Sequence, residues 1–204
     1  KNNISFSGYG IHTGVLTNMT LKPAEVNTGV KFIRIDLKDK PAIEANIDNL
    51  FSTKRSTSLK KGNAEIYTVE HILAAVTAAG IDNLNIEVDN IEIPILDGSA
   101  KEFSNKIAET ETIIQNAKRQ FLIINKTITF TDKDSGTEFI ATPSENYSID
   151  VKIDYNSKTL GIQNASISDI SKFNKEISSS RTFCFLHELE NLLEKNLIKG
   201  GEIN

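Results

Sequence analysis

The strongest constraint on the fold is a change in hydrophobic period near residue 68 of this 204-residue chain. Before it, short stretches rich in β-branched residues alternate with Gly- and Pro-containing turns, which predicts strands over residues 16–21, 30–37 and 41–47. After it, apolar residues recur at the i, i+3, i+4 and i+7 spacing of an amphipathic helix, at Val69, Ile72, Leu73 and Val76. We expect Thr68 to cap this helix and Gly80 to end it.

The rest of the chain repeats this mixture of strand and helix patterns. They predict a loop or exposed hairpin over 52–63, strands over 84–88, 121–130, 137–142 and 147–155, a turn over 92–98, and helices over 99–117 and 186–195. A weak internal echo joins Pro23-Ala24-Glu25 to Pro143-Ser144-Glu145, and either duplication or chance explains it. We predict an α+β protein with two domains, residues 1–117 and 118–204, of which the second lacks its closing elements.

Composition excludes several classes of protein. Hydrophobic residues make up 39% of the chain and charged residues 25%, as is typical of a globular protein. The net charge of −4 does not provide the basic surface that nucleic-acid binding needs. Cys184 is the single cysteine, so no internal disulfide can form, and no apolar run reaches the ~18 residues of a membrane span. These features predict a cytoplasmic protein without a transmembrane segment.

The adjacent pair Glu70-His71 is the strongest candidate for chemistry. Both residues fall in the first turn of the predicted helix and lie off its apolar stripe. The positive end of the helix dipole favours an ionised carboxylate and a neutral imidazole, which is the form that binds metal. A general base beside a metal ligand fits this arrangement, and so does an exposed helix start with an incidental histidine.

The other histidines and the cysteine have weaker patterns. His12 stands in a segment with three glycines, which indicates either close backbone approach to a ligand or a glycine-rich hairpin with a surface histidine. His187 falls on the short amphipathic helix near the end of the chain, where an exposed histidine is the simpler interpretation. We expect Cys184, between two phenylalanines, to be a small buried hydrophobic residue.

Longer motifs point to one family. The segments that carry the resemblance cover residues 10–14 (GIHTG), 24–30 (AEVNTGV), 68–75 (TVEHILAA), 80–84 (GIDNL), 87–99 (EVDNIEIPILDGS), 180–185 (SRTFCF) and 199–201 (KGG). Together they resemble UDP-3-O-acyl-N-acetylglucosamine deacetylase, the zinc amidase that commits precursors to lipid A synthesis in Gram-negative bacteria. The resemblance extends over essentially the whole chain.

The resemblance implies a fold and a set of catalytic residues. The fold is two similar α+β domains, of the ribosomal protein S5 domain 2-like type, with the active site between them. Glu70 resembles the general base of the family and His71 a zinc ligand. Thr182 resembles the hydroxyl that meets the reacting carbonyl and its oxyanion, and His12 matches a histidine near the active site.

Further positions correspond to substrate contacts. Phe183 and Phe185 fall in the insert that lines the passage for the acyl chain, and Tyr155 takes the place of an aromatic residue that packs on uracil. The chain departs from the family pattern at two of these places. Cys184 stands where the family usually has Gly, and Ser157-Lys158 replace an expected His-Pro pair.

The resemblance also implies Zn²⁺ as cofactor and UDP-3-O-acyl-N-acetylglucosamine as substrate. The family's other two zinc ligands have no counterpart in this chain, so we expect them beyond Asn204, where some members also carry a fused 3-hydroxyacyl carrier-protein dehydratase. A catalytic zinc needs three protein ligands, so we expect the 204-residue chain alone to be inactive. The alternative is a non-catalytic module that binds a nucleotide sugar or a partner on the same scaffold.

Overall fold

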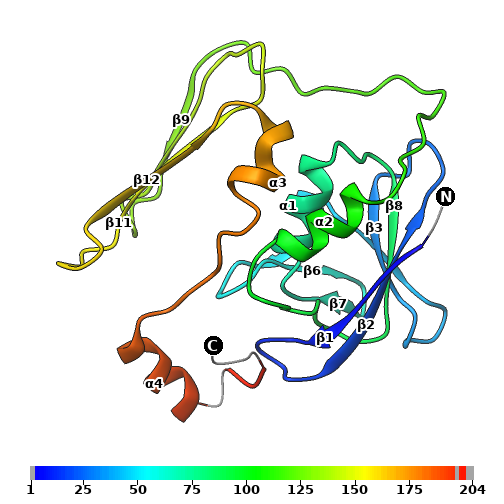
Figure 1. Ribbon diagram of the computed structural model, residues 1–204, viewed down its shortest axis with the longest axis horizontal. Helices are drawn as coiled ribbons and strands as arrows, with labels where there is room; N and C mark the ends of the chain where they lie inside the picture. The colour runs from blue at the N-terminus through cyan, green and yellow to red at the C-terminus, as the bar shows by residue number, and fades with distance from the viewer. Residues whose placement is uncertain (1–2, 196–197, 201–204) are drawn as a thin grey trace. The chain divides into compact units, whose positions relative to one another are not determined.

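The computed structural model describes residues 3–195 and 198–200 and has a mixed α and β architecture (Figure 1). The chain divides into two compact units. The first unit comprises Lys1–Ala117 together with Phe173–Asn204, and the second comprises Lys118–Lys172. The prediction that two similar domains meet at residue 117 stays a prediction, and the units are described separately below.

A five-stranded sheet forms the framework of the first unit, in the order β1-β2-β8-β3-β4. Neighbouring strands are antiparallel except β3 and β8, which run parallel. The strands cover Ile4–Tyr9 (β1), Leu16–Pro23 (β2), Val30–Arg34 (β3), Ala42–Glu44 (β4) and Leu84–Val88 (β8). Buried positions alternate with exposed or half-buried ones along β2 and with half-buried ones along β8, because one face of the sheet packs on the core.

A smaller antiparallel sheet lies between β4 and the first helix in the sequence. It has the order β5-β6-β7, with strands Leu50–Ser52, Ser58–Lys61 and Ala64–Ile66, and a 3₁₀ turn at Ile47–Asn49 (η1) precedes it. The predicted loop or exposed hairpin over 52–63 is therefore part of a sheet, since β6 pairs with both β5 and β7. Ser58 and Leu59 are buried, which corrects the expectation of an exposed hairpin.

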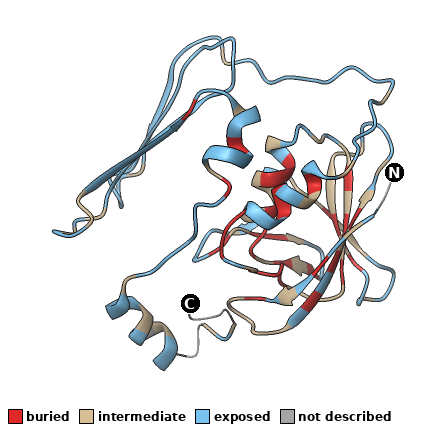
Figure 2. Ribbon diagram, viewed as in Figure 1, coloured by how far each residue is buried: buried red, intermediate tan, exposed pale blue. Residues whose placement is uncertain are grey.

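The core of the first unit lies between the large sheet and two helices, α1 (Glu70–Ala78) and α2 (Lys101–Ala108) (Figure 2). The sheet contributes Met19, Phe32 and Ile86, which are fully buried. Phe103 of α2 meets Phe6 of β1 edge to face, with ring centroids 4.9 Å apart. Burial of one such side chain contributes about 1.5–3 kcal/mol, so this core holds α1 and α2 firmly on the sheet.

Two later helices complete the first unit. The short helix α3 (Phe173–Glu176) packs near α1 and α2 and buries Phe173. Helix α4 (Leu186–Glu194) matches the helix predicted over 186–195. In the described residues no helix is long and apolar enough to cross a membrane.

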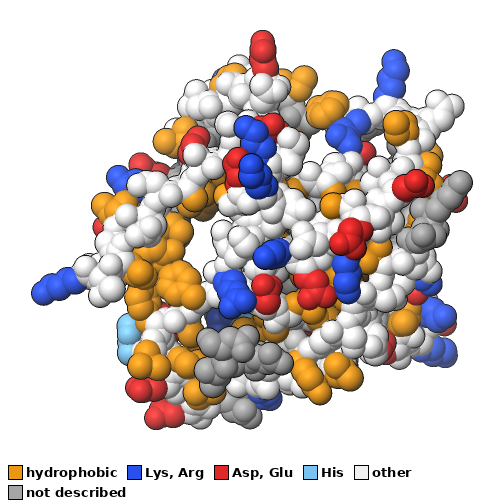
Figure 3. Space-filling model, viewed as in Figure 1, with side chains coloured by type: hydrophobic (Ala, Val, Ile, Leu, Met, Phe, Trp, Pro, Cys, Tyr) orange, Lys and Arg blue, Asp and Glu red, His pale blue; other side chains and the backbone are white. Residues whose placement is uncertain are grey.

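The second unit contains two separate two-stranded antiparallel sheets. They pair β9 (Ile128–Thr131) with β10 (Glu138–Ala141), and β11 (Ile149–Asp154) with β12 (Ile162–Ile167), and a 3₁₀ turn (η2) covers Ile170–Lys172. Hydrophobic side chains reach the surface along these strands, among them Phe130, Phe139 and Ile140 (Figure 3). Phe130 and Phe139 face each other across the β9–β10 pair, with centroids 6.1 Å apart.

The structure corrects several predicted element lengths. The strands expected over 30–37 and 41–47 are shortened to Val30–Arg34 and Ala42–Glu44. The helix expected over 99–117 ends at Ala108, because β-branched Thr110, Thr112, Ile113 and Ile114 follow and disfavour further helical turns. The strand expected over 121–130 is confined to Ile128–Thr131, since residues 121–123 are exposed and the ladder with β10 starts only at Ile128. Strand β12 was not predicted.

Candidate active site

A glycine loop, residues 10–14, connects β1 to β2 and carries His12. The loop is closed by backbone hydrogen bonds from Gly10 N to Val15 O and from Gly14 N to Gly10 O, both 2.9 Å. Ile11 O also accepts hydrogen bonds from the backbone N–H groups of Lys199 (2.9 Å) and Gly200 (3.1 Å). Two segments far apart in the sequence therefore meet at the loop that presents His12.

The carboxylate of Glu92 lies beneath the glycine loop and is completely buried. Its Oε1 accepts from His12 N (3.0 Å) and Thr68 Oγ1 (2.9 Å), and its Oε2 accepts from Thr13 N (2.8 Å) and Thr13 Oγ1 (2.6 Å). Hydrogen bonds of this kind stabilise an ionised carboxylate that has lost its water. Glu92 thus joins the glycine loop to the residue two positions before Glu70.

The start of helix α1 differs from its prediction. Thr68 was expected to be the N-cap, but Val69 occupies that position and no side chain caps the helix. Thr68 instead has a φ of 61°, in the left-handed region that β-branched residues avoid, and its hydroxyl turns to Glu92. Backbone bonds from Tyr67 N to Ile91 O and from Ile93 N to Tyr67 O flank this contact. The capping prediction was wrong because the Thr68 hydroxyl donates instead to Glu92, a residue distant in the sequence.

Glu70 and His71 occupy the first turn of α1, as predicted, and both are half-buried. Glu70 Oε2 accepts a hydrogen bond from the backbone N–H of Thr57 at 3.0 Å, and Val69 N donates to Thr57 O at 3.2 Å. Thr57, beside strand β6, therefore fixes both the helix start and the orientation of the carboxylate. The helix N-terminus also favours the negative charge of Glu70.

Thr182 lies beside the turn that follows Glu92. Its backbone N–H donates to Gly98 O at 2.9 Å, and the neighbouring Arg181 guanidinium lies 3.7 Å from the Asp97 carboxylate. Burial raises the pKa of Asp97, but the hydrogen bonds from Ser99 and the charge of Arg181 outweigh it and leave the pKa below its usual value. An ionised Asp97 thus helps to hold the segment that carries Thr182.

In the aromatic segment after Thr182, Phe183 is exposed and Phe185 is half-buried. The rings of Phe183 and Phe185 meet edge to face with centroids 5.9 Å apart, and Phe185 stacks on His187 at 5.5 Å. Cys184 is exposed, which corrects the prediction of a buried residue: its neighbours pack on each other and on α4 rather than enclosing the thiol. His187 is exposed, as the sequence indicated.

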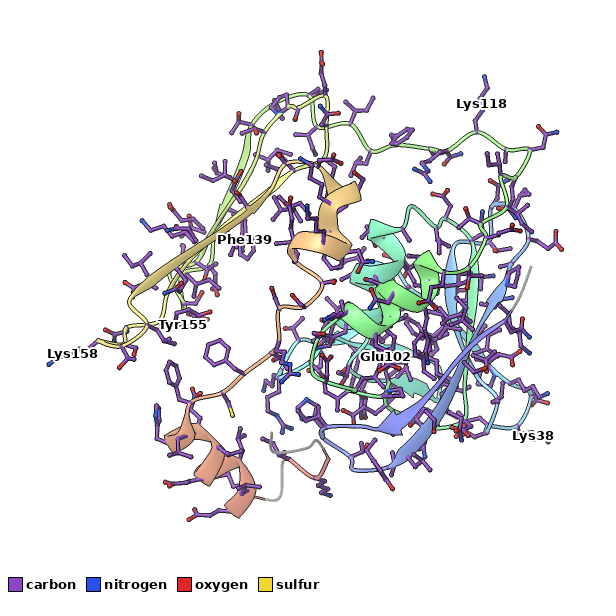
Figure 4. All side chains as sticks on the ribbon, in the orientation of Figure 1. Lys38, Glu102, Lys118, Phe139, Tyr155 and Lys158 are labelled. Carbon is purple, nitrogen blue, oxygen red and sulfur yellow. The ribbon has the colours of Figure 1, made fainter. Side chains whose placement is uncertain are left out.

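Tyr155 belongs to the second unit, whereas the other predicted site residues belong to the first. It directly follows β11, is half-buried, and donates its backbone N–H to Gly161 O at 3.2 Å. Figure 4 shows Lys158 at the tip of the same hairpin. The structure describes Tyr155 within this hairpin. In the first unit, Glu92 links the backbone of His12 to Thr68, just before the helix that carries Glu70 and His71.

The described residues do not form a metal site by themselves. Within 3–195 and 198–200, no group of three or more His, Cys, Asp or Glu side chains could hold a metal ion. Two carboxylates of the site already have partners, since Glu92 accepts four hydrogen bonds and Asp97 is bound by Ser99 and Arg181. His71 is thus a single candidate ligand, short of the three that a catalytic zinc requires.

Glu92 is the residue that the sequence reasoning missed, because residues 92–98 were interpreted only as a turn. A signal was present: Glu92 stands between Ile91 and Ile93 and is followed by Pro94 and Ile95. A lone carboxylate in an apolar stretch is either exposed at an edge or buried with several donors. Only the fold shows which of these holds.

Comparison with known proteins places the chain in a family. A family model described as UDP-3-O-acyl N-acetylglycosamine deacetylase matches residues 1–204. A relative from Bacteroides thetaiotaomicron, named as the bifunctional enzyme LpxC/FabZ, is 43% identical over 204 residues, which is 100% of this chain and 44% of the relative. A relative from Helicobacter hepaticus, named UDP-3-O-acyl-N-acetylglucosamine deacetylase, is 38% identical over 206 residues and is covered to 67%.

A third relative, from Porphyromonas gingivalis, carries the same bifunctional name and is 41% identical, again over 44% of its length. The chain thus spans less than half of the bifunctional relatives that it matches. The match of the family model over all 204 residues nevertheless includes every site segment described above. The chain belongs to the UDP-3-O-acyl N-acetylglycosamine deacetylase family.

Proposed function

We propose that the full-length protein hydrolyses the 2-acetamido group of UDP-3-O-acyl-N-acetylglucosamine, releasing acetate and the free amine in the committed step of lipid A synthesis. The family and the names of the relatives support this substrate. The observation that carries the proposal is the half-buried Glu70 carboxylate, held by the Thr57 amide in the first turn of α1 beside His71. A carboxylate fixed in this way suits a general base.

In this proposal Glu70 takes a proton from the attacking water. The water oxygen bonds to the acetamide carbon, the C–N bond breaks, and the proton passes to the departing amine. Thr182 donates its hydroxyl to the oxygen on which negative charge develops, and His12 lies beside the reacting group. We assign the acyl chain to Phe183 and Phe185 and the uracil to Tyr155. The edge-to-face pair of the exposed Phe183 and the half-buried Phe185 supports the acyl assignment, since it offers an apolar surface.

We propose that the activity depends on zinc, with His71 as one of its ligands. Because the described residues do not complete a metal site, the steps above use only this chain's own side chains. A complete site in the full-length protein needs two further protein ligands. We also propose that the protein acts in the cytoplasm and, by analogy with the bifunctional relatives, carries a fused dehydratase domain.

The proposal is tested with Glu70→Gln in the full-length protein. The amide keeps the shape and can still accept from Thr57, but it cannot take up a proton. Acetate release from UDP-3-O-acyl-N-acetylglucosamine should therefore fall by about 10²–10⁴-fold. The matched control is Glu102→Gln, which alters an exposed carboxylate in the first turn of α2 (Figure 4). Equal activities of the two variants would remove Glu70 from the role of base.

The alternative function is a non-catalytic module on the same scaffold. Such a module would bind a nucleotide sugar or a protein partner without hydrolysing it. The two functions separate in one experiment on the full-length protein with added zinc. Binding of the UDP-sugar by calorimetry without any acetate release would establish the binding module, whereas turnover would exclude it.

A further inference from the structure

We propose that Glu92 is a positioning residue that locks the loop carrying His12 to the start of the helix carrying Glu70 and His71. The inference rests on the proposed function, since it concerns the alignment of the groups assigned there. Glu92 is fully buried, so it contacts the catalytic groups through the protein interior and not through substrate. Its effect on the reaction must then pass through the residues that it holds.

The two carboxylate oxygens of Glu92 bind different partners. Oε2 is occupied by the amide and hydroxyl of Thr13, so it anchors the glycine loop alone. Oε1 accepts from both His12 N and Thr68 Oγ1, so a single atom joins the loop to the helix start. Both oxygens therefore have to be acceptors at the same time. A carboxylate meets this requirement, while an amide would turn an N–H toward one of the donors.

Thr68 connects Glu92 to the start of helix α1. Its left-handed φ of 61° is disfavoured for a β-branched residue and persists only where the surroundings fix it. Thr68 is 2% exposed, its hydroxyl is bound to Glu92, and the preceding Tyr67 pairs with the segment around Glu92. The strained residue leads directly into Val69, whose N–H is bound to Thr57, the residue that also orients Glu70.

The glycine loop is shaped to admit this carboxylate. A methyl group at Gly10 would lie 2.6 Å from Glu92 Cδ and 2.8 Å from Thr13 Oγ1, so only glycine leaves room for the contact. The loop, the carboxylate and the strained threonine thus form one continuous link between His12 and Glu70. Without the link, each element keeps its own secondary structure but loses its fixed position relative to the other. A displacement of about 1 Å between catalytic groups can reduce turnover by about 10²-fold.

The test is Glu92→Gln in the full-length protein, with Asp89→Asn as the matched control. Asp89 also accepts two hydrogen bonds, from Asn18 N (2.7 Å) and Asn18 Nδ2 (2.8 Å), but these do not reach the site. We expect Glu92→Gln to lower kcat by about 10²-fold with KM changed by less than about threefold, and Asp89→Asn to leave both unchanged. Amide exchange at His12 and Thr13, measured by NMR, should accelerate at least about tenfold in Glu92→Gln only.

A second pair of variants covers the case in which Glu92→Gln does not fold. Thr68→Val keeps the branched shape and removes the hydroxyl, whereas Thr68→Ser keeps the hydroxyl. We expect Thr68→Val to lower kcat and to accelerate amide exchange at His12. Thr68→Ser should keep kcat and the exchange rate close to their wild-type values. Faster exchange with unchanged kcat, or a change confined to KM, would overturn the positioning role. If the wild-type protein releases no acetate, the proposed function fails, while the exchange data still decide whether the link exists.

Discussion

Replacement of Gly10 by alanine tests how rigidly the buried carboxylate is held. Gly10 has no positive φ, so the backbone of this position suits alanine and the cost is steric. The new methyl group would meet Glu92 Cδ at 2.6 Å, well inside ordinary van der Waals contact, and Glu92 is enclosed on all sides. The carboxylate must therefore move and lose its bonds from Thr13.

The magnitude follows from those two bonds. A hydrogen bond to a charged group contributes about 1.5–3 kcal/mol, so the loss of both should reduce the free energy of unfolding by about 3–6 kcal/mol. The matched control is Gly62→Ala. Gly62 has a φ of 57° and no heavy atom within 4 Å of an added Cβ, so this variant carries only the backbone cost of about 1–2 kcal/mol.

The assay is urea unfolding of the full-length protein and both variants, with equal slopes required for the comparison. A double variant with Glu92→Gln should lose less than the sum of the single changes, because both act on the same contact. If Gly10→Ala proves no more destabilising than Gly62→Ala, the carboxylate is not held as rigidly as its four hydrogen bonds indicate.

Three further outcomes are expected. Thr182→Val, which keeps the side-chain shape, should lower kcat by about 10²–10³-fold with KM nearly unchanged, as steady-state kinetics would show; an effect on KM alone would contradict the oxyanion role. Because the pKa of Asp97 is lowered in the folded protein, the ionised carboxylate stabilises the fold at pH values above the pKa that Asp97 has in the unfolded chain. This stabilisation is lost as the pH falls through the pKa that Asp97 has in the folded protein. The stability difference between wild type and Asp97→Asn should therefore shrink below about pH 4 in unfolding experiments, and a difference that grows there would be contrary. The 204-residue chain alone should bind zinc weakly and release no acetate, since His71 is its single candidate ligand among the described residues; stoichiometric zinc by mass spectrometry would refute this.

The sequence by itself determined the elements whose signal is local. The i, i+3, i+4, i+7 spacing located α1, and the alternation of residues 84–88 gave the bounds of β8. Glu70 and His71 are adjacent in the sequence, and their positions in the first turn of α1 follow from helical spacing alone. Signals of this kind depend on only a few neighbouring residues, so they can be recognised without knowledge of the fold.

Tertiary structure decided what depended on partners distant in the chain. In the folded protein the Thr68 hydroxyl binds Glu92 rather than capping the helix. The carboxylate of Glu92, which the sequence analysis placed in a turn, is buried. The tertiary structure also fixed the contact of Thr182 with Gly98. The physical reason is that a buried charge must collect donors from wherever the fold brings them, here His12, Thr13 and Thr68. No local pattern specifies such a set, because each donor is typical of its own segment and becomes functional only when the segments meet.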